Sequence, residues 1–172
     1  MRPALFVFIV AMAGALRAQA PLDDVLVYGT VKHYVTSVPI EGAWVVVQRD
    51  GVKADQLVTD SAGRYEVHLA YDHVYTLFYM EAGKVGKHVR IDLQGIPDPV
   101  RVGGHGMSVD VTLFPSYPCL DASVLDEPIG LARYDPADSL IAWDIVYTER
   151  LRGRISAAMQ RYDSLRTAGG CP

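Results

Sequence analysis

The stretch TDSAGRYEVHL, residues 59–69, sets a tight turn directly before an alternating segment. Gly63 takes positive φ without a steric cost, and Asp60 is a common turn residue, so the pair predicts a bend. The segment that follows has two faces, with Tyr65, Val67 and Leu69 on one and Arg64, Glu66 and His68 on the other. Because strand side chains point alternately to opposite sides, we predict a strand with one buried face.

Similar short alternating segments recur through residues 24–114, and no helical periodicity persists there. Turn residues separate these segments, including RDG at residues 49–51. We predict seven strands, over residues 26–33, 43–49, 55–59, 64–70, 74–82, 85–93 and 107–114. Strands at this spacing are typical of an antiparallel β-sandwich, so we expect residues 21–114 to form one mainly β domain.

One predicted strand, AWVVVQR at residues 43–49, departs from simple alternation. One face carries Ala43, Val45 and Val47, whereas the other face carries Trp44 and Val46. An apolar outer face of this kind indicates either a cover supplied by the chain itself or a contact surface for another molecule.

A candidate cover lies near the C-terminal end. A connector rich in Pro and Asp over residues 115–137 is expected to lead into a helix over residues 138–168. Its apolar stripe has 4-3-4-3 spacing and consists of Leu151, Ile155, Ala158, Tyr162 and Leu165. The stripe either packs on the chain's own sheet or faces a partner protein. The candidate partner-binding residues are therefore Trp44, Val46, Leu151, Ile155, Tyr162 and Leu165.

The first twenty residues have the features of a cleavable secretory signal. Arg2 precedes an apolar run over residues 4–16, and the small-x-small ending at residues 18–20 predicts cleavage after Ala20. An N-terminal membrane anchor is the alternative, but the run is short for a bilayer span. We expect an extracytoplasmic chain, periplasmic or secreted, with no transmembrane segment once the signal is removed.

The net charge limits the classes of partner, and the length indicates the number of domains. Residues 1–20 hold two Arg and no acidic residue, so the remaining 152 residues carry 14 Lys and Arg against 20 Asp and Glu, a net charge of −6. This balance argues against nucleic acid and against an anionic membrane surface as partners. The remaining length is sufficient for one domain with a core of its own.

The chain has two cysteines, Cys119 and Cys171. In an extracytoplasmic compartment they suggest one disulfide, which would close a loop of about fifty residues. Two free thiols or an intermolecular bond are the alternatives. The sequence contains no Asn, which excludes N-glycosylation.

Several of these pieces resemble the carboxypeptidase regulatory-like domain, a prealbumin (transthyretin)-like Greek-key sandwich found in many bacterial envelope proteins. The matching motifs are Gly29-x-Val31, Pro39-x-Glu41-Gly42-Ala43-x-Val45-x-Val47 and Thr59-Asp60-x-x-Gly63-x-Tyr65. The resemblance covers residues 25–114 and implies the sandwich fold. Because its motifs are turn and core positions, it says little about function.

Two activities found among relatives with this fold do not match the chain. Hydrolases that open 5-hydroxyisourate depend on a His/Arg/His set and a C-terminal Tyr-Arg-Gly-Ser motif, and that motif is absent from this sequence. Pilin-like relatives form Lys–Asn isopeptide bonds, which a chain without Asn cannot make. The resemblance therefore favours a module without catalytic residues.

Five histidines raise the question of a metal site: His33, His68, His73, His88 and His105. Their spacing matches neither the helical nor the CxxC pattern of metal ligands, so we interpret them as solvated strand residues and expect no metal and no cofactor. A small hydrolase or metal enzyme built on His68 and His88 is nevertheless one hypothesis. GGHG at residues 103–106 lacks the Lys-Ser/Thr of a phosphate-binding loop.

We therefore expect a non-catalytic secreted or periplasmic module that contacts an unidentified protein partner or serves the cell envelope structurally. A carbohydrate- or peptide-binding module that uses Trp44 as its platform is the alternative. The position of the helix stripe relative to Trp44 and Val46 decides whether the apolar outer face is covered or open.

Overall fold

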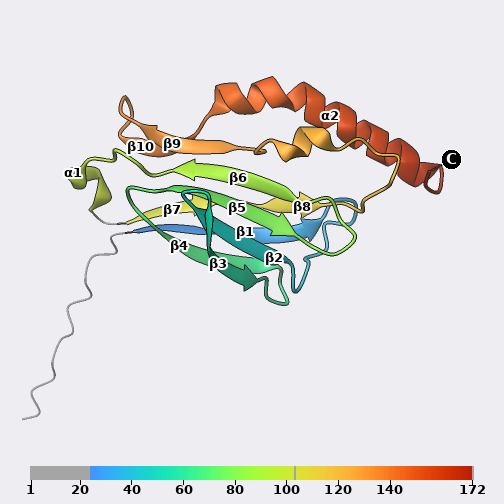
Figure 1. Cartoon of the computed structure of the whole chain (residues 1–172), viewed down its shortest axis with the longest axis horizontal. Coiled ribbons are helices and arrows are strands. Elements are labelled where there is room, and N and C mark those ends of the chain that lie inside the picture. The colour runs from blue at the N-terminus through green and yellow to red at the C-terminus, as the bar shows by residue number, and fades with distance from the viewer. Residues whose placement is uncertain (1–23, 103, 172) are drawn as a thin grey trace, which may run out of the picture.

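The structure, a computed structural model, describes residues 24–102 and 104–171. In these residues ten strands form two sheets, and a long helix follows them along one edge of the molecule (Figure 1). This confirms the predicted mainly β fold with a C-terminal helix. The predicted signal at residues 1–20 lies outside the described residues.

The first sheet is built around β1 (Asp24–His33). β1 pairs in antiparallel fashion with β4 (Arg64–Ala70). On its other side it pairs in parallel with two short strands, β7 (His105–Ser108) and β8 (Val111–Leu113). β1 is therefore the central strand of this sheet.

The second sheet has the order β10-β9-β6-β5-β2-β3, with β9 parallel to β6 and every other pair antiparallel. Its strands are β2 (Trp44–Arg49), β3 (Val52–Val58), β5 (Val74–Met80), β6 (Lys87–Asp92), β9 (Leu131–Asp135) and β10 (Leu140–Trp143). The order places the β9–β10 hairpin at one edge of the sheet and β3 at the other.

The turn before β4 is fixed by side-chain and backbone contacts. The Oδ1 atom of Asp60 accepts hydrogen bonds from the backbone N–H groups of Ala62 at 2.9 Å and Arg64 at 2.8 Å. Gly63 has a φ of +69°, and its carbonyl accepts a 2.8 Å bond from the N–H of Val31. A Cβ atom at Gly63 would lie 2.6 Å from the carbonyl oxygen of Val31. This position therefore requires glycine for both its backbone angle and its close contact.

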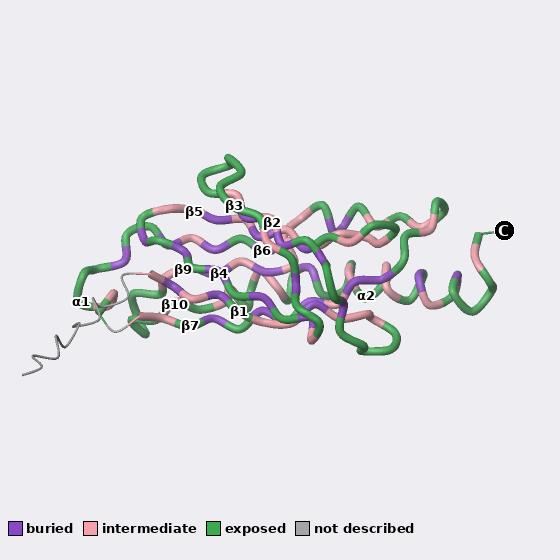
Figure 2. Tube along the Cα trace, turned by 90° about the horizontal axis from the view of Figure 1, so that it is seen from below, coloured by how far each residue is buried: buried purple, intermediate pink, exposed green. Residues whose placement is uncertain are grey.

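The core lies between the two sheets, as the alternating buried and exposed positions in Figure 2 show. The predicted inward residues of β4, namely Tyr65, Val67 and Leu69, are all buried. The hydroxyl of Tyr65 donates to the carbonyl of Val109 at 2.8 Å and lies 2.8 Å from the hydroxyl of Tyr79. Burial raises the pKa of Tyr65, so the phenol stays protonated and links both sheets.

The strand predicted over residues 107–114 is divided into β7 and β8. At the division, the Asp110 carboxylate accepts hydrogen bonds from the backbone N–H and the hydroxyl of Thr30, at 2.8 and 2.7 Å. Thr30 lies on β1, so a side chain replaces the backbone ladder at this point. The sequence pattern alone gives a continuous strand because Val109, Val111 and Leu113 still face the core.

The region after β8 contains more regular structure than the sequence suggests. The expected connector over residues 115–137 contains the 3-10 helix η1 (Ser123–Asp126) and strand β9. The helix expected over residues 138–168 begins only at α2 (Ile145–Thr167), because β10 occupies the residues before it. Asp144 caps this helix, since its Oδ1 accepts a 2.9 Å bond from the N–H of Tyr147. A short helix, α1 (Asp98–Arg101), precedes β7.

Helix α2 lies along the edge of the sandwich next to β9 and η1 (Figure 1). Its contacts with the body include aromatic rings. The Tyr162 ring lies 4.8 Å from the ring of Phe114 and 5.9 Å from that of Tyr34. A disulfide joins Cys119 to Cys171, beyond the helix. Within the described residues no helix has the length and apolar character needed to cross a membrane.

Replacing Gly63 should be more damaging than replacing another glycine with the same backbone angle. Gly51 also has positive φ, at +81°, but a Cβ there meets nothing within 4 Å. Gly51→Ala should therefore cost only the left-handed backbone strain, about 1–2 kcal/mol. Gly63→Ala adds a backbone clash and should lose about 1–3 kcal/mol more in urea unfolding. Equal losses in the two variants would contradict the described contact.

Removing the disulfide should lower thermal stability. Cys119 and Cys171 are 52 positions apart, a loop whose closure stabilises the fold by about 4 kcal/mol in the loop-entropy model. Cys119→Ser should therefore lower the Tm by about 10 °C in a calorimetric scan. Cys171→Ser should give the same shift, and a Tm unchanged in both variants would show that the bond does not constrain the chain.

Candidate functional site

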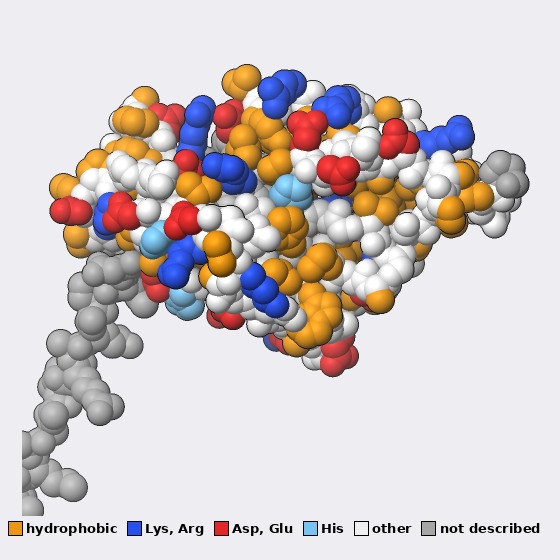
Figure 3. Space-filling view, viewed as in Figure 1, with side chains coloured by type: hydrophobic (Ala, Val, Ile, Leu, Met, Phe, Trp, Pro, Cys, Tyr) orange, Lys and Arg blue, Asp and Glu red, His pale blue; other side chains and the backbone are white. Residues whose placement is uncertain are grey.

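The outer face of the six-stranded sheet carries a row of apolar side chains. Strand register sets Trp44 between Val58 on β3 and Met80 on β5, and it sets Val46 opposite Phe78. We call these five residues the Trp44 face. Trp44 is 46% exposed, Val58 49% and Met80 40%, although the inward residues of β2 and β5 are buried. Figure 3 shows hydrophobic side chains on this side of the molecule, over β5 and β2.

The Trp44 face continues into a hollow of about 550 Å³ between the strands β5 and β6 and the short helix η1. Along its wall the His88 ring stacks on the Phe78 ring, with centroids 5.0 Å apart and planes inclined by 23°. Burial lowers the pKa of His88, and the Asp126 carboxylate opposes that shift. Burial therefore favours the neutral ring, which extends the apolar surface.

Lys87 on β6 is a residue of this region that sequence reasoning misses. Alternation puts it on the same side of the strand as Val89 and Ile91, which face the core. Its Nζ lies 5.3 Å from the centre of the Phe114 ring, and burial lowers the pKa of Lys87 to about 8. The aromatic face offsets part of the desolvation of this amine. The sequence does contain a sign of this role, because a lysine occupies a position of an alternating segment that should face the core.

Helix α2 does not cover the Trp44 face. Leu151, Tyr162 and Leu165 are buried, and Ile155 is half-buried, but Tyr162 and Ile155 belong to a cluster centred on Phe114. That cluster lies beside η1, whereas the Trp44 face lies on β2, β3 and β5. The structure thus divides the six candidate partner-binding residues into two separate groups. The helix stripe serves the chain's own packing, and Trp44 and Val46 remain on an open face.

The histidines considered as a metal or catalytic set do not converge. His68 lies on β4 and His88 on β6, which belong to different sheets. His68 Nδ1 is 3.0 Å from Asp24 Oδ2, and His73 Nδ1 is 2.6 Å from Asp50 Oδ2. Within residues 24–102 and 104–171 there is no group of three or more His, Cys, Asp or Glu side chains able to hold a metal ion.

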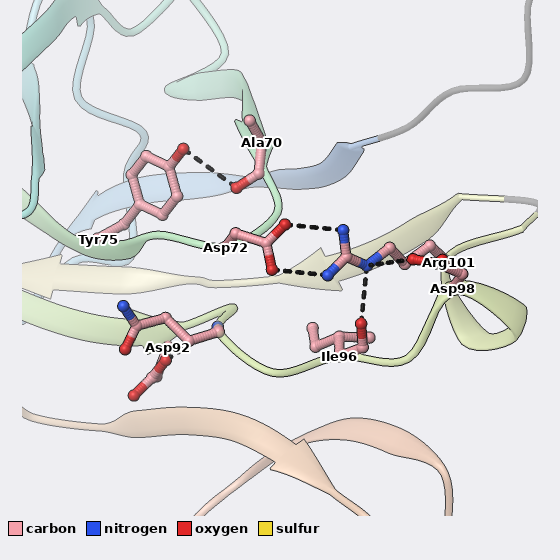
Figure 4. Close-up of polar contacts among 8 residues, drawn as sticks. Ala70, Asp72, Tyr75, Asp92, Ile96, Asp98 and Arg101 are labelled. Carbon is pink, nitrogen blue, oxygen red and sulfur yellow. Dashed lines mark hydrogen bonds and ion pairs between the residues drawn. The ribbon is translucent and has the colours of Figure 1, made fainter.

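A polar cluster around Arg101 lies at one end of the sandwich (Figure 4). The Nη1 and Nη2 atoms of Arg101 donate to the two carboxylate oxygens of Asp72, at 2.8 and 2.6 Å, and its Nε donates to the carbonyl of Ile96 at 2.8 Å. These bonds hold the pKa of Asp72 below its usual value. Because every guanidinium nitrogen is engaged, we interpret Arg101 as a clamp between α1 and the β4–β5 turn.

No model of a known protein family matches this chain. No curated protein matches its sequence. Among solved structures, the chain is similar to Klebsiella pneumoniae 5-hydroxyisourate hydrolase, with 16% identity and a TM-score of 0.40 over 54% of this chain and 91% of that one. It is also similar to the group B streptococcus pilus 2b backbone protein, with 12% identity and a TM-score of 0.39 over 54% of this chain and 42% of that one.

A third similar structure is the Bacillus anthracis TIE protein, with 14% identity and a TM-score of 0.43 over 54% of this chain and 17% of that one. The chain therefore spans less than half the length of the pilus protein and of the TIE protein. Identities this low carry no assignment of activity to this chain.

The Arg101 clamp should matter for acid stability. A carboxyl whose pKa is lowered on folding adds stability above its unfolded pKa, near 3.9, and this stability is lost as the pH falls through the lower folded pKa. Arg101→Lys keeps the charge but removes the bidentate hydrogen bonds to Asp72. It should lower the Tm and move acid unfolding to higher pH, measured by circular dichroism.

Arg64→Lys is the matched control for this experiment. The largest cause of the lowered pKa of Asp60 is the backbone N–H of Arg64, which a lysine retains. Its acid unfolding should therefore stay closer to that of the parent chain. Identical acid unfolding in Arg101→Lys and the parent chain would contradict the role of the clamp.

Proposed function

We propose that this chain is a non-catalytic extracytoplasmic accessory module of the carboxypeptidase regulatory-like kind, and that it binds a protein partner through the Trp44 face. The observation that carries the proposal is the arrangement of Trp44 between Val58 and Met80 on an open sheet face. Scattered apolar residues are normal on a surface, but a contiguous apolar group marks an interaction site.

The chemistry of the Trp44 face fits a protein partner. Tryptophan and methionine are enriched in protein interfaces, and a large aromatic side chain often supplies much of the binding energy. The face is built on hydrogen-bonded strands, so its residues are held in place before a partner arrives. This pre-organisation reduces the entropy lost on binding.

The extracytoplasmic part of the proposal rests on the disulfide and on the predicted signal. A disulfide such as the one between Cys119 and Cys171 forms and persists in an oxidising compartment. Whether the signal at residues 1–20 is cleaved after Ala20 is tested by the N-terminal sequence of the secreted chain.

The non-catalytic part of the proposal rests on the partners of the polar side chains, which pair with one another or with the backbone. Asp24 and Asp50 each hold one histidine, and Arg101 is saturated by Asp72 and a carbonyl. A sugar bound flat on Trp44 is less well supported than a protein, because its cross-strand neighbours Val58 and Met80 offer no hydrogen bonds to hydroxyl groups.

Site-specific photo-cross-linking in the native envelope tests this proposal. A benzophenone side chain at position 58, next to Trp44, should give a discrete adduct with one partner. The same group at position 66, where Glu66 lies on the outer face of the other sheet, should give none. Trp44→Ala should remove the adduct at position 58 while the variant stays folded, with the unfolding free energy lowered by about 1–2 kcal/mol because a half-buried ring is lost. Equal adducts at both positions, or none at position 58, would overturn the proposal.

A further inference from the structure

A second concave site lies away from the Trp44 face, beside the start of α2. This hollow of about 380 Å³ is within the roughly 300–1,000 Å³ range of small-ligand pockets. It is bounded by β6, the β7–β8 junction, β10 and the first turns of α2. Its lining includes Val89, Ser108, Asp110, Trp143, Glu149 and Arg152, which we call the Trp143 cleft.

The floor of the Trp143 cleft is apolar and has an aromatic wall. Val89 and Val109 belong to the buried core and line the cleft from below. The Trp143 ring packs closely over Gly130, where a Cβ atom would lie 3.0 Å from ring atom Cζ3. The absence of a side chain at Gly130 therefore lets the ring form the cleft wall.

The rim of the cleft presents both hydrogen-bond acceptors and donors. Asp110 uses its Oδ1 atom to bind Thr30, and its Oδ2 atom has no hydrogen-bond partner among the described residues. Glu149 and Arg152 form an ion pair at 2.6 Å. Residues that carry a carboxylate, an indole ring and a guanidinium thus line one small cleft.

The rim carries the two carboxylates of Asp110 and Glu149 against the one guanidinium of Arg152, which pairs with Glu149. This balance disfavours an anionic ligand, and the apolar floor and aromatic wall favour a ligand with an apolar face. A neutral ligand with an apolar face and several hydroxyl groups fits both features. Its hydroxyls can donate to the carboxylates and accept from the guanidinium.

We propose that the Trp143 cleft binds one ring of a neutral saccharide, with the apolar face of the sugar against Trp143. Asp110 and Glu149 accept hydrogen bonds from sugar hydroxyls, and Arg152 donates to a sugar oxygen. This site is separate from the Trp44 face, so a module that contacts a protein there can hold a glycan here.

Tryptophan fluorescence separates the two surfaces, since Trp44 and Trp143 are the two tryptophans of the sequence. Trp44→Phe leaves Trp143 as the reporter, and Trp143→Phe leaves Trp44. Each protein is titrated with cellotetraose, chitotetraose and maltotetraose to about 20 mM, which saturates even a site of millimolar Kd. We expect a saturating change in Trp44→Phe with at least one sugar and no change in Trp143→Phe.

Helix variants test the proposed contact independently of the tryptophans. Arg152→Ala in the Trp44→Phe background should weaken Kd about tenfold, as expected for the loss of one hydrogen bond of about 1.4 kcal/mol. Arg161→Ala, at an exposed position of the same helix outside the cleft, should leave Kd unchanged. Circular dichroism shows whether each variant folds.

Three results would overturn the saccharide site. The first is an unchanged Trp143 signal with all three tetrasaccharides. The second is a response confined to Trp44, which would place the sugar on the other face. The third is an equal weakening of sugar binding in Arg152→Ala and Arg161→Ala, which would show that the sugar does not bind in the cleft. None of these results decides the cross-linking test of the Trp44 face, so the two proposals fail separately.

Discussion

The contact between Gly63 and the carbonyl oxygen of Val31 is the constraint on which the sandwich depends. It brings the turn before β4 against β1, where the Val31 N–H binds the Gly63 carbonyl at 2.8 Å. β1 in turn pairs with β4, β7 and β8, so this contact holds the start of β4 against the central strand of the first sheet. Tyr65, two residues beyond the turn, then ties this sheet to the second through its bonds to Val109 and Tyr79. A local backbone requirement thus lies next to a side chain that links both layers.

The position of α2 follows from this packing and determines which surfaces stay open. Phe114, directly after β8, is fully buried, and its ring packs against the ring of Tyr162. The disulfide holds the end of the chain nearby. The helix therefore occupies the edge beside η1 and leaves the opposite part of the six-stranded sheet uncovered. The Trp44 face and the Trp143 cleft are both consequences of this placement, because one lies beyond the helix and the other beneath its first turns.

Alternation predicts the strands and core faces of residues 24–114 well, because each inward side chain repeats every second position. It fails where one side chain replaces backbone pairing, as Asp110 does opposite Thr30. It also fails for β9, which pairs with β6 across a long stretch of chain that no local pattern reveals. The outward position of Trp44 and Val46, two of the six candidate partner-binding residues, could be predicted because it is a property of one strand. The burial of the helix stripe and the positions of Lys87 and Trp143 could not be predicted, because they depend on contacts between segments that are distant in the sequence.

Hydroxyl-radical footprinting of the native chain, read residue by residue by mass spectrometry, distinguishes the buried helix stripe from the open Trp44 face. The helix stripe is buried by the chain itself, and the Trp44 face is open. We therefore expect rapid oxidation of Trp44 and Met80, which are 46% and 40% exposed, and protection of Tyr162 and Leu151, which are each 1% exposed. Protection of Trp44 together with oxidation of Tyr162 would contradict this arrangement.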